Sequence, residues 1–145
     1  MKNIIFRLKK ELEKNPRNTI FGKINGGNSS ISEQGVYYDF LRSADGLRAG
    51  AIDLWGYKDL NRNQYMVQDK IKWICIGQID YIPLMLKKDT NEVYIYNEIL
   101  EEDKQWILIS YFNEFIINYV LGDKYCMIVP NYIEDLWYKF IKNLY

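Results

Sequence analysis

The chain has 145 residues, and its 19 lysines and arginines balance its 19 aspartates and glutamates, so its formal charge at neutral pH is zero. It contains no histidine, which excludes serine–histidine and cysteine–histidine nucleophile pairs, histidine-bearing zinc sites and imidazole acid–base catalysis. A hydrophobic content of 48% at this length predicts one domain with a proper core, and zero net charge argues against nucleic-acid binding. Composition therefore favours a binding protein over an enzyme, although chemistry that uses only carboxylates stays open.

The first 23 residues predict an amphipathic helix and hold most of the positive charge. Apolar side chains recur at helical spacing over residues 3–14, and the helix is expected to end at Asn15-Pro16, because the residue before a proline leaves the α region. Residues 1–23 carry seven basic and two acidic residues, a net charge of +5, which leaves −5 for the remainder. The turn-rich residues 25–32 then predict a loop, which lacks the spacing of a phosphate-binding glycine loop.

A second helix is predicted over residues 33–44. Ser30 or Ser32 is its expected N-cap, and Gly46 supplies the positive φ that lets the chain stop and turn. The pattern over residues 47–57 then becomes strand-like. The polar stretch that follows, residues 58–70, is either a loop or a short surface helix.

An antiparallel meander is predicted for the middle of the chain. Val93 and Ile95 alternate with Tyr94 and Tyr96, which places aliphatic side chains on one face of that strand and aromatic side chains on the other. A tight hairpin loop is expected at residues 89–91. The predicted strands cover residues 72–79, 82–88 and 92–97, followed by an extended piece over 106–109.

Two further helices complete the predicted fold. One begins at Ser110 or Tyr111, with Ser110 as N-cap, and runs to Leu121, where Gly122 closes it. The other covers residues 131–144 after Pro130, with Asn131 and Glu134 at the spacing of a capping box. Taken together, the elements predict a single α+β domain over residues 1–145, an antiparallel sheet meander flanked by helices with an additional C-terminal helix.

The two cysteines and the lack of long apolar runs indicate a cellular compartment. Cys75 and Cys126 have the spacing of neither a disulfide framework nor a metal site, so we expect two buried thiols in a reducing environment. The apolar stretch at residues 4–6 is too short for a signal peptide, and no apolar run approaches the roughly eighteen residues of a membrane span. These features predict a cytoplasmic protein with no membrane contact, no metal and no cofactor.

Four sequence motifs follow one another between residues 20 and 121. The first is a helix at residues 38–46 that contains Phe-Leu and a later glycine and leads into a strand at 47–55. The second is a W-x-x-I-G strand at 73–77. The third is a hairpin similar to LxLDxxTGxVY at 84–94, and the fourth is a helix similar to SFxEFL at 110–116. In this order they resemble the SUKH superfamily, which contains bacterial immunity proteins and the fungal Smi/Knr cell-wall assembly regulators. The family-like core would cover about two-thirds of the chain, with the C-terminal helix outside it.

The resemblance implies a binding fold in which the bacterial members neutralise a cognate toxin, often a nuclease or another intracellular poison. It transfers no catalytic residue to this chain. The matched residues have structural explanations: Gly46 and Gly122 end helices, Gly77 permits a bulge or a close backbone approach, and Trp73 and Val93 are core candidates.

Three hypotheses about function result. The leading one is a cytoplasmic immunity protein that binds its toxin stoichiometrically through aromatic anchors and an acidic rim; 13 tyrosines and 4 tryptophans supply anchors, although an AT-rich genome would also explain the tyrosine excess. The alternatives are a non-enzymatic regulatory adaptor of the fungal type and, less favoured, a carboxylate-dependent hydrolase that uses Asp53 and Asp80. The candidate partner-binding residues are Trp55, Tyr57, Asp59, Asp80, Tyr81, Glu98, Glu101, Glu102 and Asp103. The acids from Glu98 to Asp103 are either a solvated loop or a surface that steers a basic partner.

Overall fold

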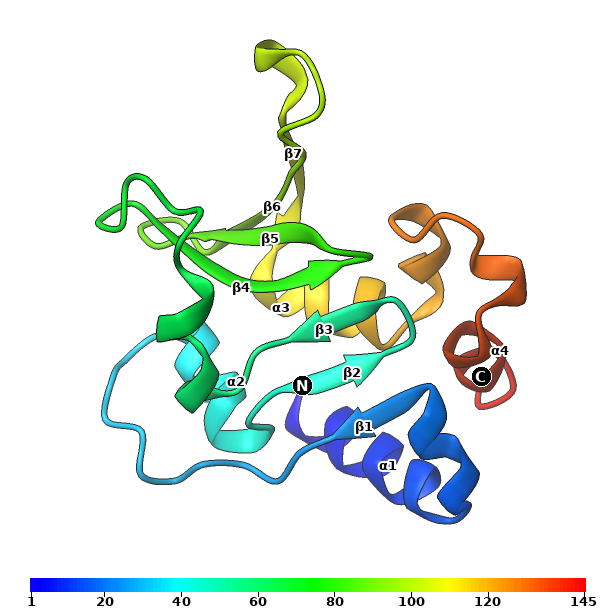
Figure 1. Ribbon diagram of the computed structural model, residues 1–145. Helices are drawn as coiled ribbons and strands as arrows, with labels where there is room; N and C mark the ends of the chain where they lie inside the picture. Colours follow the sequence, from blue (N-terminus) through cyan, green and yellow to red (C-terminus); the bar gives the residue numbers. More distant parts are fainter.

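Seven strands form one antiparallel sheet in which each strand pairs with its neighbour in the sequence, so the sheet is an uninterrupted meander (Figure 1). The computed structural model describes all 145 residues. The strands are β1 (Gly22–Ile24), β2 (Leu47–Ala49), β3 (Ile52–Leu54), β4 (Trp73–Ile79), β5 (Ile82–Lys87), β6 (Glu92–Tyr96) and β7 (Trp106–Tyr111). The predicted class, a single α+β domain with a sheet meander flanked by helices, is confirmed.

Four α-helices accompany the sheet, and short 3₁₀ turns make up most of the connections. The helices are α1 (Lys2–Glu13), α2 (Val36–Ser43), α3 (Phe112–Glu114) and α4 (Leu136–Lys142). Helix α3 continues directly into a π-helical segment, η5 (Phe115–Val120). The 3₁₀ turns are η1 (Pro16–Ile20), η2 (Tyr57–Asp59), η3 (Asn61–Asn63), η4 (Glu102–Lys104), η6 (Asp123–Met127) and η7 (Tyr132–Glu134). None of the helices combines the length and hydrophobicity that crossing a bilayer requires.

The main core lies on the face of the sheet that the helices cover. It contains 29 buried side chains, among them Leu8 of α1, Phe40 of α2, Phe115 of η5 and Trp137 of α4. The Trp137 indole N–H donates to the Val120 carbonyl at 2.9 Å, so the polar edge of this buried ring is satisfied. Each fully buried side chain of this size contributes about 1.5–3 kcal/mol to the stability of the fold.

The other face of the sheet is polar at one end and aromatic at the other. On β2 and β3, Arg48 and Asp53 are cross-strand neighbours and point away from the core. On β4 and β5, Cys75 and Met85 pair with each other and form, with Val67, a small second cluster. The aromatic end includes the tyrosines of β6, which confirms the predicted separation of aliphatic and aromatic faces.

A bulge in β4 shifts the alternation of its side chains by one residue. Cys75 pairs with Met85 and Gly77 with Leu84, so Ile76 is an extra residue that turns its side chain into the main core. A Cβ at Gly77 would lie 2.0 Å from the Asp53 carbonyl oxygen of β3. The predicted bulge and close backbone approach at Gly77 are therefore both present.

Residues 47–57 contain strand, as predicted, but the single strand that the resemblance implies at residues 47–55 is wrong. The chain instead forms β2 and β3, two strands of three residues each, joined by a turn in which Gly50 has a φ of 57°. Such short strands carry too little alternation for a turn between them to be recognised from the pattern. The ambiguous residues 58–70 contain only the short turns η2 and η3.

The predicted N-caps of three helices are also wrong. The serines before α2 and α3 make no cap, since Gly35 and Tyr111 occupy the two N-cap positions without a side-chain hydrogen bond. The C-terminal helix begins at Leu136 rather than near Asn131, which has a left-handed φ of 59° at the start of η7. Asp135 is the true N-cap, and its Oδ1 accepts from the Trp137 N–H at 2.8 Å.

Other local predictions are confirmed. Helix α1 ends before the Asn15-Pro16 step, the loop over residues 25–32 contains no helix or strand, and Gly46 has a φ of 87°. The strands β4, β5 and β6 match their predicted ranges to within a residue at each end. Both cysteines are free, but only Cys75 is buried; Cys126 is half-buried, which corrects the expectation of two buried thiols.

Candidate protein-binding surface

The β6–β7 hairpin extends beyond the rest of the sheet and ends in an acidic tip. Figure 1 shows residues 97–105, which join the two strands, projecting from the top of the molecule. The Gln105 side chain donates hydrogen bonds to the carbonyls of Glu98 and Leu100 at 3.3 and 3.1 Å. These two bonds connect the two sides of the tip. The tip carries the four predicted acids, all exposed: Glu98, Glu101, Glu102 and Asp103.

These acids remain available to a partner. Their one ion pair joins Lys104 Nζ to Glu101 Oε2 at 3.4 Å, between two exposed side chains. A pair of this kind contributes about 0–1 kcal/mol, so it fixes neither side chain. The tip is therefore an anionic projection with one lysine among its carboxylates.

Large apolar side chains lie along β7, next to the acidic tip. Trp106, Ile107, Leu108 and Tyr111 are 39%, 45%, 52% and 61% exposed. No charged residue and no proline interrupts the strand from Trp106 to Tyr111. Trp106, Leu108 and Tyr111 share one face of the strand and Ile107 lies on the other, and exposed apolar side chains gathered on one face mark interaction sites in soluble proteins.

Trp106 is held in a stack of aromatic rings drawn from three strands. Its ring lies 4.4 Å from that of Trp73 on β4 and 4.5 Å from that of Tyr96 on β6, measured between centroids. Tyr94 meets the edge of Trp73 at 5.2 Å, and its hydroxyl donates to Glu92 Oε2 at 3.2 Å. Burial raises the pKa of Tyr94, and the neighbouring Glu92 carboxylate adds to that rise. The stack holds Trp106 in one orientation although the ring is partly exposed.

A groove of about 660 Å³ runs between this stack and the segment that precedes β4. Its apolar wall includes Met66, Met85 and Trp106, and two carboxylates, Asp69 and Glu102, lie on its lining. The groove thus combines an apolar wall with the negative charge of two carboxylates. Such a site accommodates a long side chain with an apolar stem and a cationic end.

The backbone of β7 faces solvent on its outer edge, because β7 is the last strand of the sheet. The Asn97 N–H donates to the Gln105 carbonyl at 2.8 Å, and the same register continues along the hairpin to Ile107. Hydrogen-bonded and non-hydrogen-bonded pairs alternate in an antiparallel ladder. The peptide groups of Ile107 therefore face β6, whereas those of Trp106 and Leu108 point outward.

The opposite edge of the sheet is protected. Strand β1 has only three residues, and its central residue Lys23 is exposed. Short length and a lysine are two devices that prevent an edge from pairing with another chain. In this molecule β7 is therefore the edge left open for pairing.

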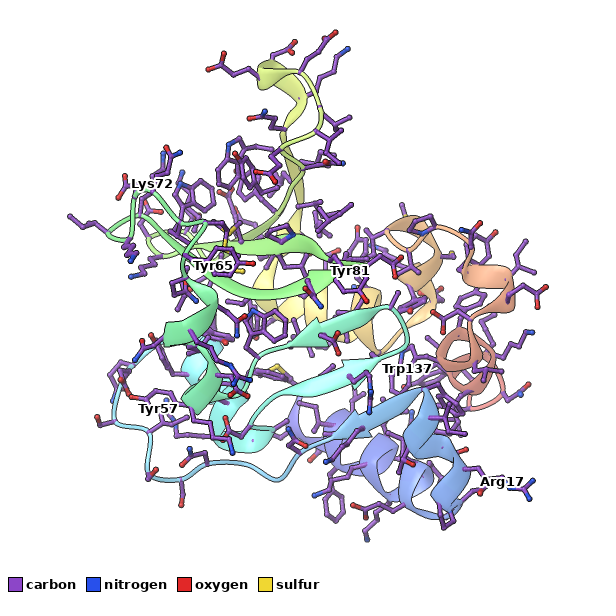
Figure 2. All side chains as sticks on the ribbon, viewed as in Figure 1. Arg17, Tyr57, Tyr65, Lys72, Tyr81 and Trp137 are labelled. Atoms are coloured by element: carbon purple, nitrogen blue, oxygen red, sulfur yellow. The ribbon has the colours of Figure 1, made fainter.

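The remaining predicted residues lie away from the hairpin. Trp55 is half-buried, and its indole nitrogen has no hydrogen-bond partner. The Tyr57 hydroxyl donates to Glu33, which lowers the pKa of that carboxyl, and Asp59 pairs with Arg62 at 3.1 Å. Figure 2 shows Tyr57 at the lower left of the molecule, far from the tip.

Asp80 and Tyr81 lie on a third, separate surface. They are the turn between β4 and β5, with left-handed φ values of 46° and 72°, and both are exposed. In Figure 2 Tyr81 lies apart from both Tyr57 and the tip. The nine predicted residues thus occupy three surfaces, of which the tip is the one next to the exposed side chains and the open edge of β7.

The hydrolase hypothesis needs Asp53 and Asp80 in one pocket, and the depression that Asp53 lines does not include Asp80. Asp53 lines a shallow depression of about 200 Å³ together with Asp59, at the polar end of the sheet. Asp80 lies in the β4–β5 turn and is not part of that lining. No group of three or more cysteine, aspartate or glutamate side chains is placed to hold a metal ion.

Three residues of this surface were missed by sequence reasoning: Trp106, Leu108 and Tyr111. The available signal was an uncharged, aromatic-rich strand of six residues, WILISY, directly after an acidic loop. Whether such a strand is central or at an edge depends on sheet order, which its own residues do not encode.

Neither the scan against protein-family models nor the search of curated proteins found a match for this chain.

Proposed function

We propose that this chain is an immunity protein that binds and neutralises a cognate toxin by stoichiometric protein–protein contact. The observation that carries the proposal is the projecting β6–β7 hairpin, which presents exposed apolar side chains, an ordered aromatic stack and an acidic tip side by side. Aromatic anchors surrounded by charge are the usual composition of a protein-binding surface.

The physical properties of the surface suit a tight complex. Because Trp106 is already stacked between Trp73 and Tyr96, it loses little conformational freedom when a partner covers it. The acidic tip attracts a basic partner over about 8 Å at physiological ionic strength, which accelerates association. A basic nuclease toxin has the matching charge.

The resemblance to the SUKH superfamily supports the same proposal. The four motifs that carry it fall on α2 with β2 and β3, on β4, on the β5–β6 hairpin, and on β7 with α3. They therefore occupy consecutive parts of one sheet. A sheet meander flanked by helices is the fold that the resemblance implies.

The test is protection of cells from a toxin. The toxin domain encoded beside this gene is expressed alone and together with the protein, and cell growth and equimolar co-purification are measured. We expect growth to be restored and the two chains to co-purify. Trp106→Ala should weaken the complex, whereas Tyr145→Ala, at an exposed tyrosine of the C-terminus, which lies apart from the hairpin in Figure 1, should not.

A folded protein that neither protects cells nor binds that toxin would overturn the proposal. In that case the regulatory adaptor of the fungal type becomes the better hypothesis, because it needs a protein-binding surface but no toxin.

A further inference from the structure

We propose that the outer edge of β7 is a docking strand: an extended segment of the toxin adds to the sheet beside β7, with basic residues placed alongside the acidic tip. This inference rests on the proposed function and specifies how the partner is recognised. Addition of a strand to an open edge provides affinity through main-chain hydrogen bonds and specificity through alternate side chains.

The outward peptide groups supply the hydrogen bonds. Trp106 and Leu108 point their N–H and C=O groups away from β6, as the register of the hairpin requires. Their side chains lie on the aromatic face with Tyr94 and Tyr96, their partners across the ladder. A segment of about six residues, roughly 20 Å long when extended, covers β7 from Trp106 to Tyr111.

The edge of the sheet at β1 is protected against pairing and the edge at β7 is not, and this difference indicates that β7 is kept open for a partner. Natural proteins block exposed edges with short strands, lysines or prolines. Strand β1 has the first two of these devices. Strand β7 has six residues, no charge and no proline, and its one bulge, at Ile109, leaves the ladder from Trp106 to Leu108 regular. A strand of this kind is an aggregation hazard unless a partner covers it.

The charge of the tip favours a basic segment over a second copy of this chain. In an antiparallel pair of two β7 strands, the tip of one copy lies beside the residues that follow Tyr111 in the other. Those residues include Asn113 and Glu114, and the Glu114 carboxylate is paired with Lys124 at 3.1 Å. A second copy therefore brings no excess positive charge to the tip, whereas a basic toxin segment brings the charge opposite to that of the tip.

Amide hydrogen exchange tests the docking strand residue by residue. It is measured by NMR on the free protein and on its complex with the toxin domain encoded beside the gene. In the free protein we expect the amides of Trp106 and Leu108 to exchange fast and that of Ile107 slowly. In the complex, exchange at Trp106 and Leu108 should slow by about tenfold or more, because each N–H then donates to the added strand.

A pair of variants separates backbone from side-chain recognition. Leu108→Pro removes an outward N–H that makes no bond within the hairpin, and Leu108→Ala truncates the side chain but keeps that N–H. We expect the Kd for the toxin to rise about tenfold more in the proline variant than in the alanine variant. Equal effects would show that the strand's backbone is not recognised.

The outcomes distinguish this inference from the function on which it rests. If the toxin is bound and neutralised while the Trp106 and Leu108 amides still exchange fast, the docking strand is wrong and the function stands. If the free protein is a dimer with these amides already protected, a second copy occupies the edge and the inference is wrong. If no toxin is bound, the proposed function fails and the docking strand fails with it.

Discussion

The Tyr125 hydroxyl connects the C-terminal segment to the sheet. It donates to Asp135 Oδ2 at 2.6 Å and accepts from the Ala51 N–H at 2.9 Å, in the turn between β2 and β3. The other oxygen of Asp135 caps α4 through the Trp137 N–H. The close fit needs a glycine, since a Cβ at Gly50 would lie 2.4 Å from the Tyr125 hydroxyl.

Replacing Tyr125 by phenylalanine should lower the free energy of unfolding by about 1–3 kcal/mol. The variant leaves the Ala51 N–H and one oxygen of Asp135 without their partner in a partly buried place. Urea denaturation measures the effect, and Tyr65→Phe is the matched control because Tyr65 is exposed; it should change the free energy by less than about 0.5 kcal/mol. Equal stability of the two variants would mean that the hydroxyl contributes nothing to the fold.

At the scale of elements, the β4 bulge depends on one glycine. Gly77 brings β4 close to β3, with no room for a side chain next to the Asp53 carbonyl. Cys75 and Ile76 point into different apolar clusters by ordinary alternation, and the bulge then keeps Ile79 on the core face of the sheet. Without the bulge, the residues beyond Ile76 would lie on the wrong face, with Gln78 turned toward the core and Ile79 away from it.

Gly77→Ala should therefore destabilise the protein by about 1–3 kcal/mol, through overpacking against the backbone of β3. Gly26→Ala is the control, because a Cβ at Gly26 meets nothing closer than Lys9 Nζ at 3.9 Å. Thermal unfolding of the two variants checks the difference. Unfolding temperatures that fall together would contradict the assigned close approach.

The acidic tip predicts an effect on binding kinetics rather than on stability. Reversing Glu101, Glu102 and Asp103 to lysine should slow association with a basic toxin by about tenfold at low ionic strength and weaken its salt dependence. The tip lies outside the buried core, so the fold should be unaffected. Stopped-flow association measured over a range of salt concentrations tests this.

A second triple variant controls for net charge. Glu13, Asp123 and Glu134 are exposed acids on other surfaces, and their reversal to lysine changes the total charge by the same amount. It should slow association much less than reversal at the tip. Equal slowing by both variants would show that net charge, and not the position of the tip, steers the partner.

The helices and strands show which secondary structure a local sequence pattern can predict. Helix α1 and strands β4, β5 and β6 were predicted because each is long enough for its periodicity to be visible. The sequence pattern does not separate strands β2 and β3, because each has only three residues. Capping-box spacings near Ser30 and Asn131 were misleading, since such spacings also occur by chance and tertiary contacts select the cap, as at Asp135.

At the scale of the whole molecule, the missing histidines set the pH response. Between about pH 6 and pH 8 the chain has no side-chain type with an ordinary pKa, so little changes its stability there. Burial raises the pKa of Cys75 above its ordinary 9.0, and burial likewise raises the pKa of Tyr37 and Tyr125 above 10.0. Groups with a raised pKa keep their proton in the folded state longer than in the unfolded state.

Stability should accordingly be flat near neutrality and fall as the pH rises above about 9. Once the unfolded chain loses a proton that the folded chain retains, each such group lowers the free energy of unfolding by up to about 1.4 kcal/mol per pH unit. Urea denaturation between pH 6 and about pH 11 measures the profile. Tyr125→Phe should make the alkaline slope shallower, and an unchanged slope would contradict the assignment to Tyr125.

The sequence by itself determined the α+β class, the long strands of the meander, the acidic loop and the exclusion of histidine chemistry, because each follows from composition or from a pattern local to one segment. Only the tertiary structure decided that WILISY is an edge strand and that Trp73, Tyr96 and Trp106 stack across three strands. It also placed the predicted site residues on three separate surfaces. Edge position and cross-strand contact depend on pairing between segments far apart in the chain, and no single segment contains that information.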